Sequence, residues 1–142
     1  MTRAIRYTLV AIALSASMAH AQASGGAPAA DGGLMAGQSL NPGDAVFSYS
    51  GQFVLLYQDD GNLVLYRQDG TPLWWAGTNT TNPGQVAMQG DGNVVVYDGN
   101  GNAQWSTGTG YSAGAWLAVQ DDGNLVVYDA NGNPLWWTGT NR

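Results

Sequence analysis

The chain has 142 residues, enough for one domain, and it contains no cysteine, so its stability must come from packing without disulfide bonds. Four residues are Lys or Arg and ten are acidic, which gives a formal net charge of −6. Nucleic acids and anionic membrane surfaces require clustered Lys and Arg, so this composition excludes both as partners.

The first 21 residues have the pattern of a secretory signal peptide. Arg3 and Arg6 precede an apolar stretch from Leu9 to Met18, and an Ala-His-Ala triplet ending at Ala21 has the small-x-small form that signal peptidase cleaves. The apolar stretch is shorter than the roughly 18 residues that cross a bilayer, so we expect no membrane insertion. We expect cleavage after Ala21, with Ala23 as the alternative, and secretion to the periplasm or the extracellular space.

Removal of residues 1–21 makes the chain more acidic. Two arginines then remain against ten aspartates, a formal charge of −8, and the single histidine is lost. Residues 22–33 are mostly Ala, Gly, Ser and Pro, which bury too little apolar surface to offset the entropy of ordering the chain. The sequence therefore predicts a signal peptide (1–21), a flexible leader (22–33) and one domain (34–142).

A nine-residue motif occurs three times in this domain, each copy 31 positions after the last. It begins at Gln58, Gln89 and Gln120 and reads Gln-x-Asp-x-Asn-x-Val-x-Tyr, with variable residues between the fixed ones. Eight residues after each tyrosine comes a tryptophan, which is followed by a Gly-Thr pair. A tandem period of this length predicts a fold built from three equivalent units.

The domain shows no helical periodicity. Short runs of Val, Leu, Tyr and Trp recur every 8 to 12 residues between Gly, Asn, Asp and Pro, which predicts an all-β chain. The Asp-Gly pair in each motif favours a hairpin, because turns that match strand twist need positive φ, which glycine adopts easily. In the first copy, residues 53–58 are expected to pair antiparallel with residues 62–66.

Side chains alternate along the strand that ends each motif. In the first copy, Leu63 and Leu65 face the core, whereas Val64 faces outward with the motif Asn and Tyr. The turn adds the Gln amide and the Asp carboxylate, which completes a shallow polar pocket around a small apolar patch. A sugar ring matches this pocket, because its hydroxyls both donate and accept hydrogen bonds above a weakly apolar C–H face. Turn geometry and strand propensity alone explain Asp-Gly-Asn but not the recurrence of Gln, Val and Tyr.

The predicted carbohydrate-binding residues are the five fixed positions of each copy. They are Gln58, Asp60, Asn62, Val64, Tyr66, Gln89, Asp91, Asn93, Val95, Tyr97, Gln120, Asp122, Asn124, Val126 and Tyr128.

This triple motif, with Trp-x-x-Gly-Thr after each copy and Leu40-x-x-Gly43 near the start, resembles the bulb-type (monocot) mannose-binding lectins from about Leu34 to Arg142. The resemblance implies a β-prism II fold: three four-stranded antiparallel sheets with pseudo-threefold symmetry and one tryptophan per repeat at the centre. Trp74, Trp105 and Trp136 match the central tryptophans. It also implies three sites for mannose-containing glycans, in which Gln, Asp, Asn and Tyr bond to hydroxyls and Val contacts the ring.

The chain departs from the family pattern in two ways. Plant members usually carry a disulfide bond, which this chain lacks. Trp75 and Trp137 follow the central tryptophans of the outer repeats, where the middle repeat has Ser106. They are expected to cap the ends of the prism; the alternatives are that they extend a sugar site or line a subunit contact.

Chains of this family often dimerise by exchanging C-terminal strands. The last predicted strand has little to anchor it beyond Trp136 and Trp137, so we expect a homodimer formed by strand exchange.

Rival functions fit the residues less well. Without His, Cys, Lys or Glu after the signal peptide, an enzyme would need Asp pairs such as Asp59 and Asp60, which splay apart in a turn, so we expect no catalysis. Calcium prefers six to eight oxygens and a closing carboxylate, but Val and Tyr occupy the closing positions, so we expect no metal or cofactor. A β-trefoil lectin has longer repeats that carry Gln-x-Trp, whereas Gln104 and Trp105 are adjacent in this chain.

A secreted lectin-like bacteriocin or antimicrobial interaction protein of the same fold is the alternative to simple glycan binding.

The three sites are not expected to bind equally. Gly90 stands where the other turns have Asp59 and Asp121, and its backbone freedom predicts weaker binding at the middle site. Arg67 follows the first motif tyrosine, where the other copies have Asp, which predicts that the first site favours acidic glycans.

Overall fold

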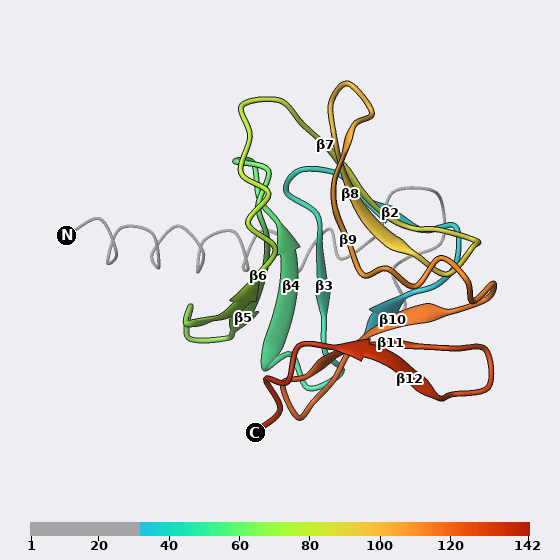
Figure 1. Ribbon diagram of the computed structural model, residues 1–142. Helices are drawn as coiled ribbons and strands as arrows, with labels where there is room; N and C mark the ends of the chain where they lie inside the picture. The colour runs from blue at the N-terminus through green and yellow to red at the C-terminus, as the bar shows by residue number, and fades with distance from the viewer. Residues whose placement is uncertain (1–31) are drawn as a thin grey trace.

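A computed structural model describes residues 32–142, which form twelve β-strands and no helix (Figure 1). None of these residues therefore belongs to a helix able to span a membrane. The predicted signal peptide and most of the predicted leader lie outside the described residues. The first strand begins at Gly33, one residue before the predicted start of the domain.

The strands form three antiparallel four-stranded sheets around a common centre, which confirms the predicted β-prism II fold (Figure 1). The first sheet contains, in order, β3 (Ala45–Phe47), β4 (Phe53–Tyr57), β5 (Leu63–Arg67) and β6 (Pro72–Trp75). The second contains β2 (Ser39–Leu40), β7 (Pro83–Met88), β8 (Val94–Asp98) and β9 (Ala103–Ser106). The third contains β1 (Gly33–Leu34), β10 (Trp116–Val119), β11 (Leu125–Tyr128) and β12 (Pro134–Trp137).

Each repeat supplies three strands of one sheet, and the segment before the repeats supplies the fourth strand of all three. The short strands β1, β2 and β3 pair with β10, β7 and β4, respectively. Residues 33–47 thus cross the whole prism and tie the third repeat to the first two. The 31-residue period gives no indication of this arrangement, because these strands have only two or three residues and carry no motif.

The core lies where the three sheets meet. The rings of Trp74, Trp105 and Trp136 contact one another there, with centroids 5.3 to 5.6 Å apart in tilted or edge-on geometry. Leu63 and Leu65 are buried against this cluster, as the strand alternation predicts. The central role expected for the three tryptophans is therefore confirmed.

Glycine sets the geometry of the motif hairpins. Gln58 N–H donates to the Asn62 carbonyl at 2.9 Å, so three residues form the loop between the paired positions. Gly61 closes this loop with a φ of 84°, and no described residue other than glycine has a positive φ. The loop is therefore a tight turn completed by a left-handed glycine.

Tyr57 links the first repeat to the second. Its side chain is fully buried, and its hydroxyl accepts a hydrogen bond from Gly84 N–H at 3.0 Å and donates to the Tyr97 carbonyl at 3.4 Å. Burial raises the pKa of this hydroxyl above its ordinary value. Gly84 sits at an irregularity in β7 where a Cβ would lie 2.2 Å from the Asp98 carbonyl oxygen, so only glycine fits.

The C-terminal strand is held more firmly than the sequence predicts. β12 pairs with β11 along its length, and Thr138 N–H donates to the Leu125 carbonyl at 3.0 Å. Arg142 N–H donates to the Asp122 carbonyl at 2.6 Å. The expectation that only two tryptophans anchor this segment is wrong, because backbone hydrogen bonds continue beyond them.

Candidate functional site

All five motif residues of each repeat lie together on the outer face of its sheet. The turn between the first two long strands of the sheet carries Gln, Asp and Asn, and the next strand carries Val and Tyr. In the first repeat, Val64 and Tyr66 lie in a cluster with Val54 and Leu56, apart from the core that contains Leu63. The predicted division between core and outer face is confirmed, while sugar binding by these residues stays a prediction.

The polar motif residues form a hydrogen-bond network among themselves. In the first repeat, the Gln58 amide donates to the Asp60 carboxylate at 3.0 Å, and the same carboxylate accepts from Asn62 N–H at 2.9 Å. The Tyr66 hydroxyl donates to the Gln58 side-chain carbonyl. Asp60 thus shapes the turn as well as facing outward, so turn geometry explains part of its role.

The other two repeats reproduce this network. The Gln89–Asp91 and Gln120–Asp122 side-chain bonds both measure 3.1 Å, and both carboxylates accept from the following asparagine N–H at 2.9 Å. The Tyr97 and Tyr128 hydroxyls donate to the glutamine of their own repeat. These bonds fix the side chains before any ligand arrives.

The side-chain oxygen of the motif asparagine accepts hydrogen bonds from the backbone of the same repeat. Asn62 Oδ1 accepts hydrogen bonds from Gly77 N–H at 2.9 Å and Thr78 N–H at 3.1 Å. Asn124 Oδ1 accepts from Gly139 N–H and Thr140 N–H at 2.9 and 3.3 Å. The Gly-Thr pair therefore braces the site, a role that its fixed spacing in the sequence could have revealed.

In the middle repeat, Gly108 N–H donates to the Ser106 hydroxyl at 3.3 Å rather than to the motif asparagine. Asn93 Oδ1 accepts from Thr109 N–H at 3.2 Å and from the Thr107 hydroxyl at 3.2 Å. Within residues 32–142, the Nδ2 atoms of all three motif asparagines donate no hydrogen bond. Each site thus presents an oriented amide N–H that remains available to a ligand.

The motif residues of the third site line a cavity. A hollow of about 270 Å³ is lined by all five of its motif residues together with Pro134, Trp137 and Asn141. Its polar groups are a fixed carboxylate, three amides and a phenol, and Val126 belongs to its apolar lining. This arrangement can bind the hydroxyls and the C–H face of one sugar ring.

At the second site, hydrogen bonds stabilise the charged form of the Asp91 carboxylate. The pKa of Asp91 is lowered by the hydrogen bond from Asn93 N–H and then by the bond from the Gln89 amide. The carboxylate is therefore charged at neutral pH and accepts hydrogen bonds only.

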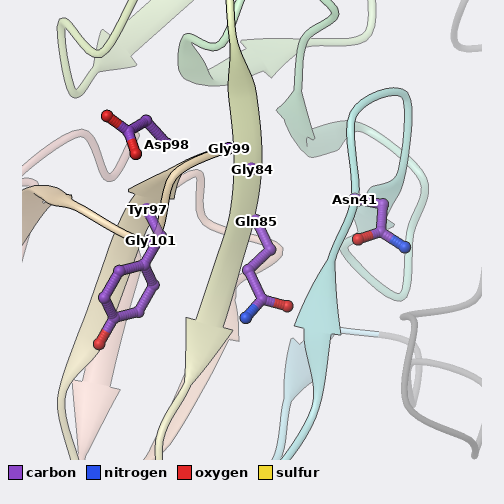
Figure 2. Close-up of a pocket in the computed structure, with 7 residues that line it drawn as sticks. All are labelled: Asn41, Gly84, Gln85, Tyr97, Asp98, Gly99 and Gly101. Carbon is purple, nitrogen blue, oxygen red and sulfur yellow. The ribbon is translucent and has the colours of Figure 1, made fainter.

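A second hollow of about 400 Å³ lies beyond Tyr97 on the middle sheet. Figure 2 shows the Gln85 amide projecting from β7 between Tyr97 on β8 and Asn41 beyond the end of β2. Gln85 is directly opposite Tyr97, where the third sheet has Trp116 opposite Tyr128. The rings of Trp116 and Tyr128 stack with centroids 5.0 Å apart, so an indole lies against the tyrosine there.

The geometry gives little support to Arg67 and Gly90 as causes of unequal sugar affinity among the three sites. The Arg67 guanidinium forms a 2.8 Å salt bridge to Asp69, which offsets the cation expected to attract acidic glycans. Gly90 does not have positive φ, and Asp91 accepts the same 2.9 Å bond as its counterparts. Unequal affinity stays a prediction, but it needs another cause.

Trp75 and Trp137 do not lie where the sequence interpretation put them. They are directly opposite Val64 and Val126, on the outer faces beside the first and third sites, and are 58% and 56% exposed. The expectation that they cap the prism ends is therefore wrong, because each continues the outward-facing row of its sheet.

No His, Cys, Asp or Glu residues of the described part gather in threes where they could hold a metal ion.

No protein-family model and no curated protein matches the chain, whereas many solved structures do. The Marasmius oreades lectin is similar, with 39% identity and a TM-score of 0.72 over 78% of this chain and 92% of that lectin. A monomeric monocot mannose-binding lectin from Gastrodia elata has 36% identity and a TM-score of 0.72 over 79% and 100%. The mannose-specific snowdrop (Galanthus nivalis) agglutinin, complexed with methyl-α-D-mannoside, has 36% identity and a TM-score of 0.63 over 79% and 99%. With this identity over nearly the whole length of these lectins, the chain belongs to the bulb-type (monocot) mannose-binding lectin family.

Proposed function

We propose that this protein is a non-catalytic lectin that binds mannose-type sugars through its three Gln-x-Asp-x-Asn-x-Val-x-Tyr sites. The observation that carries the proposal is one preformed hydrogen-bond network built three times, each time with an asparagine N–H left available above a valine. The similar snowdrop and Polygonatum cyrtonema lectins, each solved with a mannoside, support mannose as the sugar.

The chemistry of each site divides between its residues. The Asp carboxylate accepts hydrogen bonds from two neighbouring hydroxyls, while the Asn and Gln amides donate to hydroxyl oxygens. The Tyr oxygen, whose proton is already donated to Gln, accepts from a further hydroxyl. Val packs on the ring carbons. A hydroxyl is both donor and acceptor, so it can join two of these groups at once.

Calorimetry with methyl α-mannoside in excess chelator tests the proposal. A shallow pocket for one ring predicts a dissociation constant on the order of 1 mM, about −4 kcal/mol per site, with avidity for glycans that engage several sites. We expect three molecules bound per chain and no effect of the chelator. Methyl α-galactoside, with its hydroxyls oriented differently, is the matched control. Equal affinity for both sugars, or loss of binding in chelator, would contradict the proposal.

We also propose that the protein is secreted, on the strength of the Arg-flanked apolar run and the Ala-His-Ala triplet. Intact-mass measurement of the exported protein should give a chain that starts near Gln22. Recovery of the chain from the cytosol with Met1 retained would contradict export. A bacteriocin-like role would use the same sites and stays a prediction.

A homodimer formed by exchange of C-terminal strands belongs to the same proposal. β12 is an edge strand that pairs only with β11, so exchange would replace these pairs with equivalent ones from a second copy. Light scattering should show a dimer. A monomer at the highest accessible concentration would count against exchange without affecting sugar binding.

A further inference from the structure

One wall of the third site is an indole that lies outside the motif. Trp137 on β12 is directly opposite Val126 on β11, and Cβ atoms at such positions lie about 5 Å apart on the same face. Trp137 also lines the cavity formed by all five motif residues. A ligand that extends beyond the motif on this side would therefore meet the indole first.

The exposure of this indole is unusual among the tryptophans. All six tryptophans lie within residues 32–142, and four of them are partly buried against other rings: the central three and Trp116, which stacks on Tyr128. Only Trp75 and Trp137 are more than half exposed, and each is opposite a motif valine. Trp137 lines the cavity of the third site, so a ligand there can cover this apolar surface and gain free energy from its burial.

The middle repeat lacks this feature. Ser106 is opposite Val95, so the second site has a hydroxymethyl group where the third has an indole. Its nearby hollow lies on the other side of Tyr97 and is lined by the polar side chains of Gln85 and Asn41 (Figure 2). The chain therefore contains its own comparison between a site with an adjacent aromatic and a site without one.

We propose that Trp137 forms a second subsite of the third site, where its indole face stacks on the C–H face of a sugar residue linked to the sugar held by the motif. The negative face of an aromatic ring attracts the weakly positive C–H groups of a sugar. Trp75 has the same place beside the first site and the same role there. The middle site, with Ser106, binds one residue only. The inference rests on the proposed function, because the motif must hold the first sugar.

The test isolates one site at a time. The double variant Asn62→Asp/Asn93→Asp disables the other two sites and leaves the third for calorimetry. Its ligands are methyl α-mannoside and the α-1,2-, α-1,3- and α-1,6-linked mannobioses. We expect at least one mannobiose to bind about fivefold more tightly than the monosaccharide, the gain typical of one aromatic contact. Trp137→Ser should remove this gain, and Trp137→Phe should keep most of it.

Two further measurements would not respond to a merely structural role. The indole N–H resonance of Trp137, assigned by its loss in Trp137→Phe, should shift with the mannobiose and far less with methyl α-mannoside. In the reciprocal double variant Asn62→Asp/Asn124→Asp, which isolates the middle site, adding Ser106→Trp should create the preference for the mannobiose.

The outcomes separate the two proposals. If the unaltered protein binds no methyl α-mannoside, the proposed function fails. If it binds the monosaccharide but no mannobiose gains more than about twofold, or the gain survives Trp137→Ser, the subsite is overturned and the lectin assignment stands. If Trp137→Ser does not fold, the result with Ser106→Trp decides.

Discussion

Each motif asparagine serves the fold with one atom and faces the ligand with another. Oδ1 accepts hydrogen bonds from the Gly-Thr segment, whereas Nδ2 points out of the network unpaired within the described chain. An alanine at this position would remove both functions together. A substitution that changes only Nδ2 distinguishes binding from folding.

We predict that Asn62→Asp, Asn93→Asp and Asn124→Asp each abolish one site and preserve the fold. Aspartate keeps the Oδ1 acceptor but replaces the N–H donor with an oxygen, so a sugar hydroxyl oxygen loses its partner. Calorimetry with methyl α-mannoside should show one third of the stoichiometry lost per change. The Asn→Ala controls should lose the site and also about 1 to 2 kcal/mol of unfolding free energy, because backbone N–H groups lose their acceptor. Unchanged stoichiometry in all three Asp variants would refute the site assignment.

At the scale of the hairpin, two glycines in one turn have opposite requirements. Gly92 has a φ of 97°, and a Cβ there would lie 2.1 Å from the Ser112 carbonyl oxygen. Gly90 lacks positive φ, and a Cβ there would meet nothing within 4 Å. The turn requires glycine at position 92, whereas position 90 has room for a side chain.

We therefore predict that Gly92→Ala lowers the unfolding free energy by about 2 kcal/mol or more, through backbone strain and the clash with Ser112. Gly90→Ala is the matched control and should stabilise the protein by about 0.4 to 1 kcal/mol, because it restricts the unfolded chain. Urea denaturation of both variants measures the difference. Equal losses from the two changes would show that this description of the turn is wrong.

The features of the fold that could be predicted from the sequence are those that recur in each repeat. The hairpins, the core position of Leu63 and Leu65, and the central tryptophans follow from local alternation and the 31-residue period. A position of Trp137 beside a site is one of three alternatives that the sequence leaves open, because it depends on a register shift between Val127 and Tyr128. The same shift occurs in all three sheets, so what distinguishes the surroundings of the sites is the residue opposite the motif valine, which is Trp in the outer repeats and Ser106 in the middle one.

At the scale of the whole molecule, segments without a motif close the prism. β1, β2 and β3 each complete a different sheet, so the N-terminal segment connects the three repeats. The turns that join the last two strands of the second and third sheets are closed by carboxylates. Asp98 and Asp129 accept from the N–H groups of Asn102 and Asn133 at 2.9 and 2.8 Å. These bonds hold the pKa of each carboxyl below its ordinary value.

The pKa of Asp69 is also lowered, chiefly by the hydrogen bond from Arg67, and so is the pKa of Asp91 in the second site. A carboxyl whose pKa is lower in the folded state contributes stability that is complete above its unfolded value, near 3.8, and is lost as the pH falls through the folded value. We predict that the unfolding free energy is nearly constant from pH 7 to about 5 and falls below pH 4. Melting temperatures measured from pH 7 to about 2 check this, and the double variant Asp98→Asn/Asp129→Asn, which keeps an acceptor oxygen in both turns, should lose less stability in acid. An identical acid profile for the double variant and the parent protein would show that these two turns do not control the response.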